Sequence, residues 1–350
     1  METILFVTST EADGTLNRHA LEALGTAVDT AVSLPGSPLV VGLFGEKIEA
    51  AANSIANCGA VRFLGVEGAE FTQARYATDA AALEMLCRAS KATLVIAPAT
   101  SRMARVIAGV SHRLNGRIDT HVNAIATSND QVAITRWFYR QRMFSELTRT
   151  QRPWLLSVDS GCHTAYQGES QNVDIELLPI VLGSDHLRTK VAGFKAPSAD
   201  QQTIRPDADL LFVTGAGWTK KQKDGQTHPK EAEQLILGFL RETKASLGGS
   251  KSLVDMSGEG EQVLQFMSHL NQVGQTGATP RHPKGLSTCC HGEEPHVVGW
   301  RFIRERRAVN LDPNCGWARG KADVLYVADA FEVVAKVNAL LAEKHSTVNA

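Results

Sequence analysis

The chain has 350 residues, of which 43% are hydrophobic and 21% charged, and its formal net charge is −1. Because a single hydrophobic core stops growing near ~250–300 residues, a chain of this length is expected to form two domains. The balanced charge gives no sign of a nucleic-acid surface. The sequence contains no apolar run of about 18 residues, so we expect no transmembrane helix. The six cysteines are scattered and lack the spacing of a disulfide framework. An apolar run begins already at Ile4 and leaves no room before it for a targeting segment. We therefore expect a cytoplasmic protein.

The first 125 residues alternate between short apolar runs and alanine-rich segments with helical periodicity. Such apolar runs are typical of parallel strands that are buried on both faces, and alanine favours helix. The expected strands cover residues 4–7, 39–44, 61–64 and 92–97. The expected helices cover residues 19–32, 47–58 and 77–89. This repeated order predicts an α/β fold whose parallel sheet has right-handed crossovers.

A Thr-Ser pair follows the fourth expected strand, in Pro98-Ala99-Thr100-Ser101, and precedes an expected helix at 103–114. A hydroxyl at this place caps a helix by accepting a backbone N–H. It could also contact a phosphate, because the carboxyl ends of parallel strands face the ligand crevice. We favour the cap.

Residues 120–182 are richer in strand patterns, and we expect them to form an antiparallel extension of the first sheet. The expected strands cover residues 121–125, 132–137, 154–158 and 173–177. A polar, proline-bearing stretch at 195–206 is typical of an interdomain linker. The sequence therefore predicts an N-terminal domain at 1–194, a linker at 195–206, a second domain at 207–340 and a flexible tail at 341–350.

The second domain is expected to begin with a strand at 208–213 and the loop Thr214-Gly215-Ala216-Gly217. This loop lacks the third glycine of a dinucleotide fingerprint, and no acidic residue closes a strand ~20 positions on, which argues against an NAD site. A helix is expected from 229 to 242, with Gly248-Gly249 stopping it. A final amphipathic helix is expected at 328–343.

The segment Val273-Gly274-Gln275-Thr276-Gly277 follows a helix-like run at 261–270. Glycine permits backbone angles and close approaches that a Cβ forbids, so Gln275 and Thr276 could reach a flat ligand.

Several short motifs accompany this pentapeptide: Ser250-Lys251 upstream and His296, Asn310 and Asp329 downstream. In that order and spacing they resemble the FAD-binding domain of the electron-transfer flavoprotein α subunit family. Pro98-Ala99-Thr100-Ser101 in the first half is similar to a segment of the same family. The resemblance implies an N-terminal α/β domain that contacts a β subunit and a C-terminal α/β domain that binds FAD.

The resemblance also implies roles for individual residues. Lys251 stands where the family has an arginine that lies over the flavin and favours its reduced forms. Gln275 and Thr276 match residues that reach the flavin and its ribityl chain, and His296 matches a histidine at the pyrimidine edge. Asn310 and Asp329 match residues that face the adenosine half. The full implied FAD site is Thr214, Gly215, Ser250, Lys251, Val273, Gly274, Gln275, Thr276, His291, His296, Asn310 and Asp329.

The activity that the resemblance implies is that of a redox carrier, without general acid, nucleophile or metal. The α subunit would bind one FAD, and the β subunit would complete a heterodimer and hold AMP or a second FAD. Such a complex takes electrons from a flavin dehydrogenase, acting on acyl-CoA or N-methylated amines, and passes them to a quinone-linked oxidoreductase. A zinc site is not expected, because the vicinal Cys289-Cys290 pair lacks zinc-ligand spacing.

The chain departs from the family at several positions near the implied cofactor. Gly217 and Trp218 replace an arginine and a glycine, and His291 replaces a serine that faces phosphate. Glu293 and Glu294 bring negative charge toward the pyrophosphate. These departures keep open a second hypothesis, a scaffold subunit with weakened or lost FAD binding. A third, a nucleotide-dependent enzyme formed by the first domain alone, lacks a phosphate-binding loop.

Overall fold

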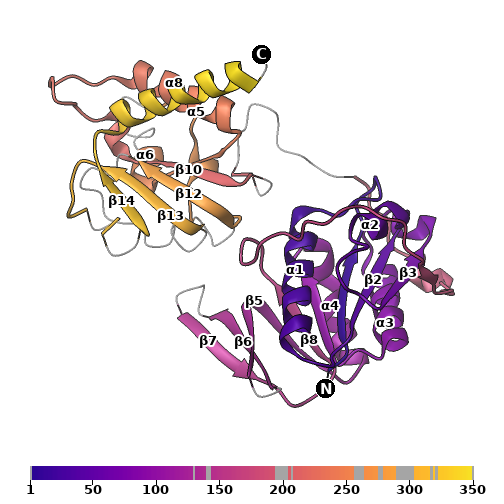
Figure 1. The fold of residues 1–350 in the computed structure, drawn as a ribbon. Coiled ribbons are helices and arrows are strands. Elements are labelled where there is room, and N and C mark those ends of the chain that lie inside the picture. Colours follow the sequence, from indigo (N-terminus) through magenta and orange to yellow (C-terminus); the bar gives the residue numbers. More distant parts are fainter. Residues whose placement is uncertain are drawn as a thin grey trace. The chain divides into compact units, whose positions relative to one another are not determined.

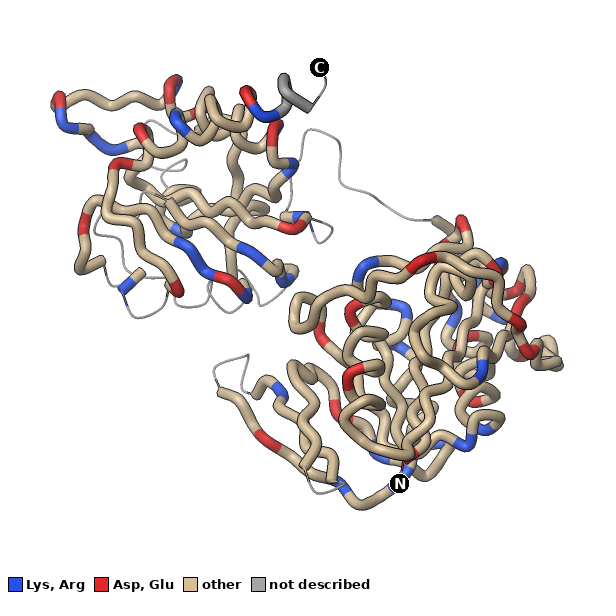
Figure 2. Tube along the Cα trace, in the orientation of Figure 1, with Lys and Arg blue, Asp and Glu red and all other residues tan. Residues whose placement is uncertain are grey.

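A computed structural model describes most of the chain, namely residues 2–128, 131–138, 143–193, 204–205, 208–255, 264–274, 279–288, 303–315, 318–319 and 322–348. The chain divides into two compact units, Met1–Phe194 and Lys195–Ala350, each with its own sheet (Figure 1). Most of the expected linker lies outside the described residues. None of the described helices combines the length and apolar composition that crossing a bilayer requires. Acidic and basic residues are interspersed along both units (Figure 2).

The N-terminal unit is built on a nine-stranded sheet in the order β7-β6-β5-β8-β4-β1-β2-β3-β9. Its strands are β1 (Ile4–Ser9), β2 (Leu39–Gly45), β3 (Arg62–Glu67), β4 (Leu94–Pro98), β5 (Arg117–Ser128), β6 (Gln131–Phe138), β7 (Met143–Thr148), β8 (Trp154–Val158) and β9 (Glu176–Leu177). Strands β1 to β4 are parallel, which confirms the predicted α/β fold. Each expected strand of the first 125 residues forms within a few residues of its predicted bounds.

Helices cover both faces of this sheet. Helices α1 (Arg18–Ser33) and α2 (Glu49–Ser54) contribute to the core on one face. On the other face lie α3 (Tyr76–Ser90) and α4 (Ser101–Arg113). Short 3-10 helices lie at Ala69–Phe71 (η1) and Ser184–Leu187 (η2). The Thr100 hydroxyl accepts a hydrogen bond from the Met103 N–H at 3.2 Å, so the predicted cap of α4 is confirmed.

The antiparallel extension consists of β5, β6 and β7, and two strands assigned to it from the sequence belong elsewhere. Strand β8 runs parallel to its neighbours β4 and β5 and is buried along its whole length. Its unbroken apolar run is the pattern of a central parallel strand, so the antiparallel assignment was wrong. Strand β9 is short and parallel to β3, and β7 was not predicted.

The second unit has a five-stranded, wholly parallel sheet in the order β11-β10-β12-β13-β14. Its strands are β10 (Leu210–Thr214), β11 (Ser246–Gly249), β12 (His282–Thr288), β13 (Ile303–Asn310) and β14 (Val324–Val327). Helices α5 (Pro229–Thr243) and α8 (Ala330–Val348) lie together on one face (Figure 1). Helix α6 (Lys251–Asp255) and the 3-10 helices η3 (Ala216–Thr219) and η5 (His269–Asn271) lie in the connections.

Three expectations for the second unit are corrected. Helix α5 ends where Lys244 turns left-handed at φ +52°, whereas Gly248-Gly249 belong to β11 and do not stop the helix. A Cβ on either glycine would collide with Val273 or Met267, so packing explains them. Residues 264–270 form a turn and the start of η5 instead of the expected helix, and α8 continues to Val348 through residues expected to be a tail.

Candidate functional site

The candidate site lies along the carboxyl edge of the second sheet. Because all five strands are parallel, their carboxyl ends meet at one edge, which is where open α/β sheets bind ligands. The strands end at Thr214, Gly249, Thr288, Asn310 and Val327. The structure therefore brings Thr214, Gly215, Ser250, Lys251, Asn310 and Asp329 to this edge, from four of the five strands.

Hydrogen bonds fix the carboxyl ends of β11, β10 and β12, three neighbouring strands on one side of the sheet. The Gly215 N–H donates to the Thr288 carbonyl, and the Ser250 N–H donates to the Thr214 carbonyl, both at 2.8 Å. The buried Thr214 hydroxyl donates to the Gly248 carbonyl at 3.1 Å. Thr214 thus connects β10 to β11 through its carbonyl and its hydroxyl, and these contacts fix the backbone positions of the neighbouring Gly215 and of Ser250.

The Ser250 and Lys251 side chains have different tasks. The Ser250 hydroxyl accepts from the Leu253 N–H at 3.2 Å, so Ser250 begins α6. Lys251, the first residue of α6, is exposed at the carboxyl end of β11. A cationic side chain therefore stands at this edge of the sheet, where the sequence predicted one beside a flavin.

The segment that carries Val273 and Gly274 packs beside β11. The Val273 N–H donates to the Gly249 carbonyl at 3.0 Å, and the Gly274 N–H donates to the Thr279 hydroxyl at 2.8 Å. Gly274 has φ +84°, a conformation that favours glycine. Residues 275–278 follow directly, so the predicted Gln275 and Thr276 lie outside the described residues.

Asp329 links the last strand to α8. Its Oδ1 accepts from the Phe331 N–H at 2.9 Å, and its Oδ2 lies 3.5 Å from the Lys223 ammonium. Lys223 also contacts Glu332 at 3.3 Å. The hydrogen bond from Lys223 to Glu332, then the charges of Glu332 and Asp329, raise the pKa of Lys223. Asp329 therefore caps α8 and holds a cation near the carboxyl edge.

Trp218 fills the core beneath the loop that follows β10. Its side chain is 0% exposed, and its ring lies 4.6 Å from that of Phe331, centroid to centroid. The indole N–H donates to the Thr288 hydroxyl at 2.8 Å, and this hydroxyl donates to the Val213 carbonyl at 3.1 Å. The tryptophan that replaces a family glycine is thus an interior side chain that braces β10 and β12.

The rest of the predicted site cannot be placed. His291 and His296 lie outside the described residues, as do the departures at Glu293 and Glu294. Within the described ranges, no cluster of His, Cys, Asp and Glu side chains is suited to a metal ion.

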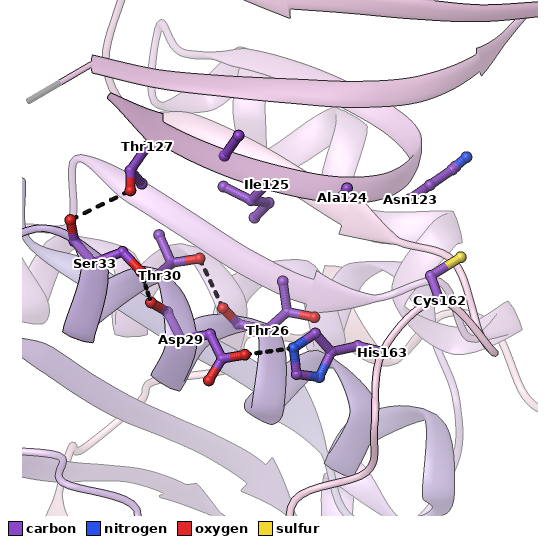
Figure 3. Close-up of a pocket in the computed structure, with 11 residues that line it drawn as sticks. Thr26, Asp29, Thr30, Ser33, Asn123, Ala124, Ile125, Thr127, Cys162 and His163 are labelled. Atoms are coloured by element: carbon purple, nitrogen blue, oxygen red, sulfur yellow. Dashed lines mark hydrogen bonds and ion pairs between the residues drawn. The ribbon is translucent and has the colours of Figure 1, made fainter. Parts of the chain in front are cut away.

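The N-terminal unit contains a cavity of about 360 Å³ that sequence reasoning missed. It lies between α1 and the distal half of β5, with Cys162 and His163 at its end (Figure 3). The His163 Nε2 lies 2.8 Å from the Asp29 carboxylate, and its Nδ1 lies 2.9 Å from the Thr164 carbonyl. The sequence places these residues far apart, so no local pattern signals the cavity.

The fold and the site together define a two-domain α/β protein with a candidate cofactor site at the carboxyl edge of its second parallel sheet. The family model described as Electron transfer flavoprotein domain matches residues 4–180, more than half of the 350 residues. The chain therefore belongs to the electron transfer flavoprotein family. A search of curated proteins gives no match.

Proposed function

We propose that this chain is the α subunit of an electron transfer flavoprotein and binds FAD at the carboxyl edge of its second sheet. The observation that carries the proposal is the convergence of Gly215, Ser250, Lys251, Gly274 and Asp329 at or beside that edge, in a chain of this family. These residues are scattered over more than 100 positions of sequence, and the fold collects them.

The residues present at the edge fit such a cofactor. Lys251 supplies a cation toward the ring, and Gly274 offers a backbone that a Cβ does not obstruct. Asp329 retains acceptor capacity, because each carboxylate oxygen has two lone pairs and each makes one of the contacts described above. The bound flavin would supply the redox chemistry, while the protein binds it, orients it and sets the local charge.

The partners follow from the family as proposals. A β subunit that holds AMP or a second FAD would complete a heterodimer. A flavin dehydrogenase would donate electrons, and a quinone-linked oxidoreductase would accept them. We also place the protein in the reducing cytoplasm, where thiols such as those of the buried Cys58 and Cys87 stay reduced.

Co-expression with a candidate β subunit tests the proposal, followed by a visible spectrum of the purified complex. A yellow heterodimer with about one flavin in this subunit, reduced by a dehydrogenase, is the expected result. A stable but colourless heterodimer would contradict it and favour the scaffold hypothesis, which the family departure at Trp218 motivates. A yellow complex that no dehydrogenase reduces would contradict the carrier role.

A further inference from the structure

A second hollow, of about 280 Å³, lies at the amino edge of the first sheet, between the end of α4 and the start of β5. Because β4 and β5 are both parallel to β8, the helix that connects them returns to the edge at which these strands begin. The Gly116 N–H donates to the Ser111 carbonyl at 2.8 Å, and the Arg117 N–H donates to the Pro153 carbonyl at 2.9 Å. These bonds hold the end of the helix against the start of the strand.

The polar side chains that line this hollow are hydrogen-bond donors. Ser111 and His112 line it from α4, Arg117 from β5 and Arg149 from the segment after β7. No Asp or Glu is among its described lining residues. The Ser111 hydroxyl, the His112 ring and the Arg117 guanidinium make no hydrogen bond or ion pair with the described part of the chain. Their donors are therefore available to a ligand.

Arg149 is held in place by the buried Asp119. Its Nε and Nη2 donate to the Asp119 carboxylate at 2.9 and 3.0 Å. Its remaining nitrogen, Nη1, has no hydrogen-bond partner among the residues that the structure describes. A guanidinium that is fixed on one side loses little further side-chain entropy when its other N–H groups bind an anion. The hollow thus combines one preorganised cation with the exposed Arg117.

Positive charge exceeds negative charge around the hollow. Asp119 lies next to it, and Glu84 pairs with Arg113 at the end of α4; each of these two carboxylates is shared by two arginines. Arg117 adds a fifth arginine, which has no carboxylate partner in the described ranges. Each of the last four carbonyls of α4 already accepts a hydrogen bond, which weakens their repulsion of an anion.

We propose that this hollow binds the phosphate group of a small, non-aromatic ester. Guanidinium and imidazole N–H groups, together with a hydroxyl, supply the charge-assisted hydrogen bonds that a phosphate dianion accepts. The volume lies just below the range of about 300–1,000 Å³ that is typical of ligand pockets, so the hollow is too small for a dinucleotide. Apart from His112, no aromatic side chain among the described lining residues could stack on a nucleobase. The proposal does not depend on the cofactor site of the second unit.

Calorimetric titration of the full chain with glycerol 3-phosphate, inorganic phosphate and glycerol tests the proposal. Glycerol 3-phosphate should bind one to one and more tightly than inorganic phosphate, and glycerol should not bind. An Arg117→Gln variant should keep the parental Tm and weaken binding at least tenfold, because it removes a cation that stabilises the ligand and no described contact within the chain. Arg62→Gln is the matched control and should keep parental affinity. Arg62 also begins a strand of this sheet, but it pairs with Glu176 at 2.7 Å.

A second variant, Ala108→Glu, adds a carboxylate at an exposed lining position on α4 and should abolish binding. Absence of saturable binding to the parent chain overturns the proposal. Equal weakening in Arg117→Gln and Arg62→Gln also overturns it, because the attraction would then be unspecific. Inorganic phosphate that binds as tightly as glycerol 3-phosphate overturns the assignment to an ester. None of these results changes the flavin content of the heterodimer, so this inference and the proposed function fail separately.

Discussion

The buried carboxylate of Asp119 is expected to hold the base of the β5–β6–β7 extension. Its side chain is 1% exposed and accepts four hydrogen bonds. Two come from Arg149 at 2.9 and 3.0 Å, one from Arg136 at 3.1 Å and one from the Trp154 indole at 2.9 Å. The carboxylate thus joins β5 to β6, to β8 and to the residue after β7.

An Asp119→Asn substitution should destabilise the N-terminal unit by about 3 kcal/mol. Breaking a buried ion pair by removing one partner costs about 3–5 kcal/mol, and the lower end applies because Arg136 and Arg149 remain 20% and 39% exposed. For a domain of this size the loss lowers Tm by roughly 6–12 °C. Scanning calorimetry and urea unfolding of the full chain measure it.

The stabilisation that Asp119 provides is expected to decrease at low pH. Burial acts to raise the pKa of Asp119, but hydrogen bonds from Arg149 and Trp154 and the two guanidinium charges leave it below the ordinary value of 3.8. The stabilisation is therefore fully present above that value and is lost as the pH falls through the folded-state pKa. The difference between the parent chain and Asp119→Asn should shrink in acid.

Asp185→Asn is the control, because Asp185 is 87% exposed and lies 3.9 Å from Arg188. It should unfold within about 0.5 kcal/mol of the parent chain. If Asp119→Asn also unfolds within that margin at neutral pH, the carboxylate does not hold the extension and the reasoning fails.

Three further substitutions or modifications test the site and the core. Lys251→Ala should lower the flavin potential by up to the order of 100 mV, because it removes a cation near the ring, while Lys344→Ala, at an exposed residue near the end of α8 distal from Asp329, should leave it unchanged; equal potentials of Lys251→Ala and the parent chain in a redox titration would refute the charge effect. Trp218→Phe should cost about 1–2 kcal/mol through the lost bond to Thr288 but retain flavin, and a colourless variant of parental stability would give Trp218 a direct binding role instead. Burial raises the pKa of Cys87 to about 12, so a thiol reagent at neutral pH should modify the half-buried Cys162 and spare Cys87, as peptide mapping would show; labelling of Cys87 in the folded chain would contradict this.

Sequence patterns predicted the parallel core well because its strands are short, continuous apolar runs. The same rule would have assigned Trp154–Val158 correctly had it been applied there. The Gly248-Gly249 pair was wrongly predicted to stop helix α5 for a different reason. Both glycines are needed for packing against Val273 and Met267, which are more distant in the chain. Likewise, the burial of Trp218 depends on Phe331, which no local pattern reveals.

The family resemblance and the family match fall on different parts of the chain. The motifs that carried the resemblance lie mostly between 214 and 329, whereas the matched region is 4–180. All twelve predicted site residues stay predictions as cofactor contacts, and four of them, Gln275, Thr276, His291 and His296, also lie outside the described residues. Those at the carboxyl edge could be placed because each one ends or follows a strand.

The cavity in the N-terminal unit depends on how β5 changes course where it leaves β8. His121 has φ +59°, an unfavourable conformation for a residue with a Cβ, and the β5–β6 register shifts between Val122 and Ala124. The His121 ring lies 3.3 Å from the Asp159 carboxylate, and the Asp159 N–H donates to the Val122 carbonyl at 2.9 Å. These contacts compensate the local strain and turn the strand at this point. The ion pairs of Asp119 with Arg136 and Arg149 therefore lie on one side of the bend and the cavity on the other, so a substitution at Asn123 should not loosen the contacts that Asp119 makes.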